Sequence, residues 1–95
     1  MQKGKIEMER PQISKELVRD VVKIIEHKIE DRLDEKGRGI FVSRHEVMGV
    51  ILEEFNEAIY ACENEELHNF MGEILDVAVG CAIALASFRT EKMEW

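Results

Sequence analysis

Five acidic residues in two short segments of the sequence could hold a metal ion. Glu53, Glu54 and Glu57 lie in the first segment, and Glu73 and Asp76 lie in the second. Within each segment the acids recur three or four residues apart, a spacing that makes side chains neighbours on a helix. Carboxylate oxygens are the ligands that hard divalent cations such as Mg²⁺ and Mn²⁺ prefer. The spacing therefore predicts a cation site wherever the two segments come together.

Asp76 and Glu54 are unusual because both fall among apolar residues. Asp76 is the only polar side chain in residues 74–86, ILDVAVGCAIALA. At 100° per residue, Glu54 falls between Val47 and Val50 on the apolar side of its own helix. A buried carboxylate without a partner is costly, so it is usually protonated or paired with a cation. Both acids are therefore predicted to face the interior, whereas Glu53 lies nearer to solvent.

The sequence before the acidic segments predicts a loose arm and one amphipathic helix. Residues 1–13 are mostly polar and predict a flexible N-terminal arm. Ser14 is a candidate N-cap, and after it apolar residues recur at helical spacing. This helix should end near Lys36, because Gly37 follows it and a glycine just past the last turn commonly ends a helix. No strand pattern occurs, so residues 14–95 are predicted to form a single all-helical domain.

The acidic segments themselves fall on a second and a third predicted helix. Ser43 and Glu46 have the spacing of a capping box, so the second helix should begin there and run to about Cys62. Asn64 is a candidate cap for the third helix, which should span residues 65–88. Two helices joined by so short a turn are antiparallel neighbours. The predicted architecture is an antiparallel helical hairpin preceded by one further helix.

Folding the hairpin brings the acids to one level. With the turn centred between residues 63 and 64, Glu54 lies level with Glu73. The carboxylates of Glu54, Glu57, Glu73 and Asp76 then fall within about one and a half turns, or roughly 8 Å along the helix axis. Four like charges at this range repel one another, and a Mg²⁺ or Mn²⁺ ion would offset the repulsion. These four residues are therefore the predicted metal ligands.

A structural network of ion pairs is the alternative explanation for these acids. No lysine or arginine lies between Arg44 and Arg89. A positively charged partner would therefore have to come from the first helix, from the connector of residues 37–42 or from another subunit. The metal site is the favoured hypothesis, and the ion-pair network stays open beside it.

The two acidic segments also resemble the signature of a known family. The sequence reads EEFNE at residues 53–57 and EILD at residues 73–76. This order of E-E-x-x-E and E-x-x-D is similar to that of the all-α nucleoside triphosphate pyrophosphatases, the MazG-like superfamily. The resemblance covers roughly residues 47–85. It implies an enzyme that uses Mg²⁺ to hydrolyse a nucleoside triphosphate to the monophosphate and pyrophosphate.

The resemblance also implies a role for each acid. By position, Glu54, Glu57, Glu73 and Asp76 would bind the metal, and Glu53 would be a catalytic carboxylate that orients the attacking water. The phosphates need basic partners, for which the candidates are Lys36, Arg38 and Arg44. Candidates for stacking on the nucleotide base are Phe41, Tyr60 and Trp95.

Composition limits the classes of partner and the location. The chain has 95 residues and a net charge of −7, which argues against a nucleic-acid backbone as its ligand. The longest uncharged apolar run, residues 77–86, is about half as long as a membrane span. Cys62 and Cys81 form no CxxC motif, and residues 1–10 contain no apolar signal-peptide core. These features predict a cytoplasmic protein without a membrane partner.

The apolar run of residues 77–86 predicts self-association. It presents apolar or small side chains on every side, and such a helix is normally buried all round. Two other helices of one chain can hardly cover it. We therefore expect a homodimer or homotetramer whose assembly completes the bundle. A non-catalytic helical interaction module, or a metal-stabilised oligomerisation module of the same fold, is the alternative to an enzyme.

Overall fold

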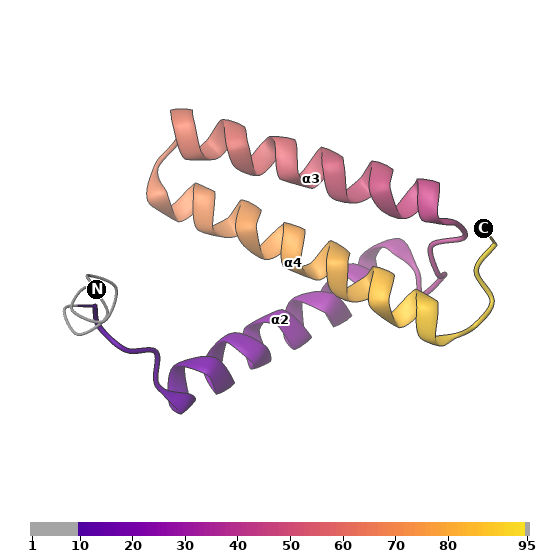
Figure 1. The fold of residues 1–95 in the computed structure, drawn as a ribbon, viewed down its shortest axis with the longest axis horizontal. Helices are drawn as coiled ribbons and strands as arrows, with labels where there is room; N and C mark the ends of the chain where they lie inside the picture. The colour runs from indigo at the N-terminus through magenta and orange to yellow at the C-terminus, as the bar shows by residue number, and fades with distance from the viewer. Residues whose placement is uncertain (1–9, 95) are drawn as a thin grey trace, which may run out of the picture.

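The computed structural model describes residues 10–94 and is all-helical in that range (Figure 1). Helix α2 spans Lys15–Lys36, α3 spans Arg44–Asn64 and α4 spans Leu67–Arg89. No strand occurs among these residues, and a single isolated bridge joins Ser43 to Glu94. The predicted all-α fold class is therefore confirmed. Most of the predicted arm, residues 1–9, and the base-stacking candidate Trp95 lie outside the described residues.

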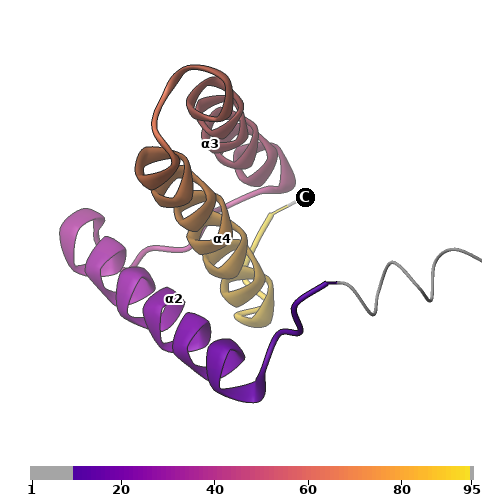
Figure 2. The same cartoon turned by 90° about the vertical axis from the view of Figure 1, so that its left-hand side faces the viewer.

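Helix α4 lies in the middle of the structure. It packs against α3 as an antiparallel hairpin and against α2 on another side, as both views show (Figures 1 and 2). Helix α2 runs obliquely to the hairpin (Figure 1), and its backbone does not approach that of α3. Only long side chains of α2 can therefore reach the acids of α3.

Local hydrogen bonds explain where α2 begins and ends. The Ser14 hydroxyl accepts a hydrogen bond from the Leu17 amide at 3.1 Å, as expected for an N-cap. At the other end the Gly37 amide donates to the Leu33 carbonyl at 2.8 Å. Gly37 has a φ of 95°, which glycine adopts without the steric penalty of a side chain. The predicted limits of the first helix are confirmed.

The start of α3 is also confirmed, with a small difference in its cap. The Ser43 hydroxyl accepts from the Glu46 amide at 3.2 Å. The Glu46 carboxylate accepts from the Val42 amide at 2.7 Å, one residue earlier than in a standard capping box. The same residue, Val42, accepts from the Glu94 amide through its carbonyl, which ties the C-terminal segment to the connector.

The turn between the two hairpin helices lies later than predicted. Helix α3 continues to Asn64, so the prediction that Asn64 caps the third helix is wrong. Its side-chain amide donates instead to the Tyr60 carbonyl at 3.0 Å, within its own helix. The N-cap of α4 is Glu66, which makes no side-chain capping bond. The turn is thus centred between Glu65 and Glu66, and this moves every residue pairing along the hairpin.

The core is small and is built mainly by the hairpin. Val79, Ala61 and Ala58 are almost fully buried between α3 and α4. The buried Ser87 hydroxyl donates to the Ile83 carbonyl at 2.8 Å and accepts from the Phe41 amide at 3.0 Å. This joins the connector to α4. By contrast, α2 contributes no buried residue.

Much apolar surface stays exposed on all three helices. Leu85 is 64% exposed although it belongs to the run that was expected to be covered. Leu17 of α2, Leu52 of α3 and Met71 of α4 are each more than half exposed. One chain therefore leaves large apolar side chains exposed to water, and self-association, which stays a prediction, would cover them.

By length and composition, α4 could cross a membrane, and within residues 10–94 it is the one helix that could. The core helix of a water-soluble protein has the same properties. Helix α4 packs on both neighbouring helices and carries Glu73 and Asp76. A cytoplasmic location stays a prediction.

Candidate metal centre

Three of the four predicted metal ligands come together across the hairpin. Glu54 and Glu57 of α3 and Glu73 of α4 offer carboxylate oxygens that all lie within 4.8 Å of one another. Two oxygens bound to one ion at roughly 2.1–2.4 Å are at most about 4.2–4.8 Å apart. The three oxygens therefore fit around one hard cation. Glu54 and Glu73 are half-buried, and Glu57 is exposed, so an ion would reach the site from solvent.

The position of the turn explains why these residues pair as they do. With the turn between Glu65 and Glu66, Glu57 lies close to the level of Glu73, and Glu54 lies close to the level of Asp76. The acids still fall within about two helical turns, although the predicted pairing of Glu54 with Glu73 is replaced.

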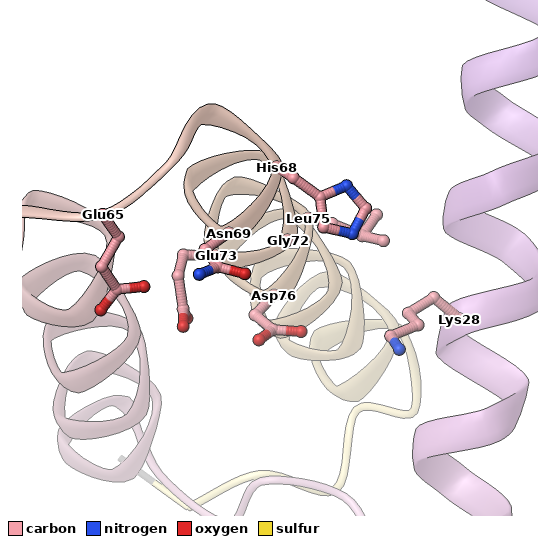
Figure 3. Close-up of a pocket in the computed structure, with 8 residues that line it drawn as sticks. All are labelled: Lys28, Glu65, His68, Asn69, Gly72, Glu73, Leu75 and Asp76. Carbon is pink, nitrogen blue, oxygen red and sulfur yellow. The ribbon is translucent and has the colours of Figure 1, made fainter. Parts of the chain in front are cut away.

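Asp76 lies beside the three acids rather than among them. Its side chain is 32% exposed, and its carboxylate is 3.7 Å from the guanidinium of Arg32. Glu73 and Asp76 project from the same side of α4, with Glu65 on one flank and Lys28 of α2 on the other (Figure 3). These residues line a cavity of about 450 Å³. Asp76 is thus a neighbouring carboxylate rather than one of the three that lie within 4.8 Å of one another.

Crowding changes the acidity of two of these carboxyl groups. Burial raises the pKa of Glu54 above its ordinary value, the negative charges of Asp76 and Glu57 raise it further, and Arg32 partly offsets the increase. Burial also raises the pKa of Glu73, followed by the charges of Asp76 and Glu57. Both groups therefore gain from binding either a proton or a metal cation.

Arg32 of α2 is the residue that the sequence analysis missed. Its guanidinium lies 3.9 Å from the Glu54 carboxylate and 3.7 Å from that of Asp76, so it bridges α3 and α4. Both distances are too long for hydrogen bonds. A cation from the first helix was one of the sources that the ion-pair alternative left open. In the sequence, Arg32 stands next to Leu33 at the edge of the apolar stripe of α2, and this position was the feature that could have identified it.

Of the three predicted phosphate-binding residues, only Lys36 lies near the acids. It lines a cavity of about 240 Å³ together with Arg32, Glu54 and Asp76. Arg38 instead donates a hydrogen bond of 2.8 Å to Glu30. This pairing raises the pKa of Arg38 and lowers that of Glu30.

Arg44 and the catalytic candidate Glu53 lie on α3 outside the group of three acids. Arg44 is the first residue of α3 and stands ten residues before Glu54, or about 15 Å along the helix. Glu53 is exposed and lines a neighbouring cavity of about 290 Å³ with Glu54 and Arg32. Its catalytic role stays a prediction. Of the base-stacking candidates, Phe41 is half-buried against the core, and Tyr60 is exposed.

The chemistry of the arrangement suits a hard cation and, through such a cation, a phosphate-bearing molecule. Carboxylates of two helices supply the oxygen ligands, and a bound ion would link them to further anionic groups. Comparisons with protein-family models, curated proteins and solved structures find no match for this chain. Its function is therefore inferred from the residues of the site and from the resemblance of its two acidic motifs.

Proposed function

We propose that the chain is a Mg²⁺-dependent nucleoside triphosphate pyrophosphohydrolase that releases the nucleoside monophosphate and pyrophosphate. The proposal depends chiefly on one observation: Glu54, Glu57 and Glu73, from two helices, bring their oxygens within 4.8 Å. The motifs EEFNE and EILD, which resemble those of the all-α pyrophosphatases, support the same reaction. Mn²⁺ has the same preference for oxygen ligands and would serve in place of Mg²⁺ as the bound ion.

The five acids divide between two tasks in this reaction, which are binding the ion and orienting the attacking water. Glu54, Glu57 and Glu73 would hold the ion, and Asp76 would supply a fourth carboxylate from α4. When bound, a Mg²⁺ ion held by these residues would screen the charge of the phosphates and help to align an attacking water. Glu53 is next to Glu54 but exposed, so it could orient that water without binding the ion.

We further propose that the protein works as a homodimer or homotetramer in the cytoplasm. The exposed apolar residues on α2, α3 and α4 support self-association, because contiguous apolar surface is normally covered in a soluble protein. A nucleoside triphosphate is the proposed small-molecule partner.

A non-catalytic module is the second candidate, and one observation favours it. Arg32 lies within 4 Å of both Glu54 and Asp76, so part of the acidic charge is neutralised without a metal. In that case the acids and Arg32 would fasten α2 to the hairpin, and the apolar surfaces would bind other chains.

A pyrophosphate-release assay distinguishes the two candidates. Wild-type protein is incubated with a panel of ribo- and deoxyribonucleoside triphosphates in Mg²⁺, in Mn²⁺ and in EDTA. We expect metal-dependent release of pyrophosphate, which Glu57→Gln removes. Glu63→Gln is the matched control, because it neutralises an exposed acid of the same helix outside the group of three. Absence of pyrophosphate with every nucleotide, while the metal still binds, would favour the non-catalytic module.

A further inference from the structure

One face of α2 carries three basic residues, and their position indicates a second part of the site. Lys28, Arg32 and Lys36 are spaced four residues apart and therefore follow one another along the same side of the helix. All three line the cavity of about 240 Å³ that Glu54 and Asp76 line from the other side. Two acids of α2 also line it, at the positions between these basic residues: Asp31 and Glu35. The cavity thus lies between two acids of the hairpin and a wall on α2 that carries three cations and two acids.

Arg32 is placed in this cavity with its hydrogen-bonding capacity unused. Its side chain is only 19% exposed. Within residues 10–94 its guanidinium forms no hydrogen bond, because the carboxylates of Glu54 and Asp76 lie 3.9 and 3.7 Å away. A guanidinium has five N–H donors in a planar fork that matches two oxygens of one phosphate group. A half-buried group of this kind therefore gains from a ligand that supplies oxygens at shorter range.

A cation among the acids would change the partners of Arg32. The ion and the guanidinium compete for the same negative charge, since both are attracted to Glu54. Metal binding would therefore weaken the electrostatic attraction between these acids and the Arg32 guanidinium. Phosphate oxygens gathered by the ion would then offer Arg32 hydrogen-bond acceptors in addition to the acids that line the cavity.

We propose that Lys28, Arg32 and Lys36 form the phosphate-binding wall of the site, and that Arg32 moves from the acids to the phosphate chain when metal and polyphosphate bind. This inference rests on the metal site of the proposed function. It replaces Arg38 and Arg44, which the structure does not bring to the acids, with two other basic residues of α2. The ligand class is a metal-bound polyphosphate chain.

The test measures binding of Mn²⁺ alone and of inorganic tripolyphosphate at saturating Mn²⁺, both by titration calorimetry on the full chain. We expect Arg32→Gln to bind Mn²⁺ alone at least as tightly as wild type, because a competing cation has gone. The same variant should bind tripolyphosphate at least about tenfold more weakly, the scale of one lost hydrogen bond between charged groups. Arg38→Gln is the matched control, because it removes the same charge from a residue whose partner is Glu30.

Lys28→Gln keeps the test decisive if Arg32→Gln does not fold, as circular dichroism would show. Lys28 is exposed, and its loss should weaken tripolyphosphate binding while Mn²⁺ affinity changes little. Failure of wild-type protein to bind Mn²⁺ would overturn the proposed metal site itself. Normal Mn²⁺ binding, with tripolyphosphate affected equally by the cavity variants and by Arg38→Gln, would overturn the phosphate-binding wall alone.

Discussion

Metal binding should stabilise the folded protein strongly. In the absence of metal, Glu54, Glu57 and Glu73 offer oxygens within 4.8 Å of one another, and Arg32 is the basic residue of the described range that pairs with Glu54, at 3.9 Å. The unfolded chain separates these carboxylates, so the ion binds mainly the folded state. Linkage then adds about 2.7 kcal/mol to the free energy of unfolding at a metal concentration one hundred times Kd. For a domain of this size, about 1 kcal/mol raises Tm by roughly 4–8 °C. The expected increase in Tm is therefore about 11–22 °C.

Removing one ligand should reduce this increase by a predictable amount. Glu57→Gln deletes one of three carboxylates, and a loss of about tenfold in affinity is the least we expect. At the same metal concentration the stabilisation then falls to about 1.4 kcal/mol or less, compared with about 2.7 kcal/mol for wild type. Glu63→Gln, which changes an exposed acid elsewhere on α3, should keep the full increase.

Thermal unfolding followed by circular dichroism provides the assay. Wild type and both variants are melted in EDTA, MgCl₂, MnCl₂ and NaCl of matched ionic strength. NaCl should not reproduce the effect of the divalent ions, because the site selects by coordination rather than by screening. The reasoning is refuted if millimolar Mg²⁺ or Mn²⁺ leaves Tm at its EDTA value, or if Glu57→Gln responds as wild type does.

Three further outcomes are expected. Glu54→Gln should weaken Mn²⁺ affinity by about tenfold or more, whereas Glu53→Gln should reduce turnover with little effect on affinity. Equal losses of Mn²⁺ affinity in calorimetry would show that the two residues do not have different roles. The raised pKa values of Glu54 and Glu73 mean that, just above the ordinary glutamate pKa, the folded state binds more protons than the unfolded state. As pH rises through this window in EDTA, the free energy of unfolding of wild type should therefore fall relative to that of Glu54→Gln. Urea titrations that show the opposite trend would contradict the pKa directions. Light scattering at micromolar concentration should report a dimer or larger species, and a stable monomer would refute self-association.

The helices and the acidic hairpin could be predicted because local sequence determines them. Ser14 and Ser43 cap their helices through bonds to amides only three residues away. Gly37 ends α2 through its own backbone conformation. The spacing of Glu54, Glu57 and Glu73 on two antiparallel helices then requires only a short turn to bring them together.

The remaining features depend on choices that local sequence leaves open. Asn64 could cap the following helix or bond within its own, and the Tyr60 carbonyl one turn away makes the second choice available. That choice moves the turn and changes which acids are level. The position of Arg32 depends on how α2 crosses α4, which is a matter of packing rather than of periodicity. Arg38 was a candidate for the site, but it donates a hydrogen bond of 2.8 Å to Glu30 of α2 instead.

The most direct test of the metal centre is a calorimetric titration with Mn²⁺ of wild type, Glu57→Gln and Glu73→Gln. These variants remove one carboxylate each from α3 and from α4, and Glu63→Gln serves as the control. If acids of both helices bind the same ion, either substitution should weaken binding by about tenfold or more, and the control should match wild type. If wild type binds no Mn²⁺, or if only one helix's variant loses affinity, the two helices do not share a metal site.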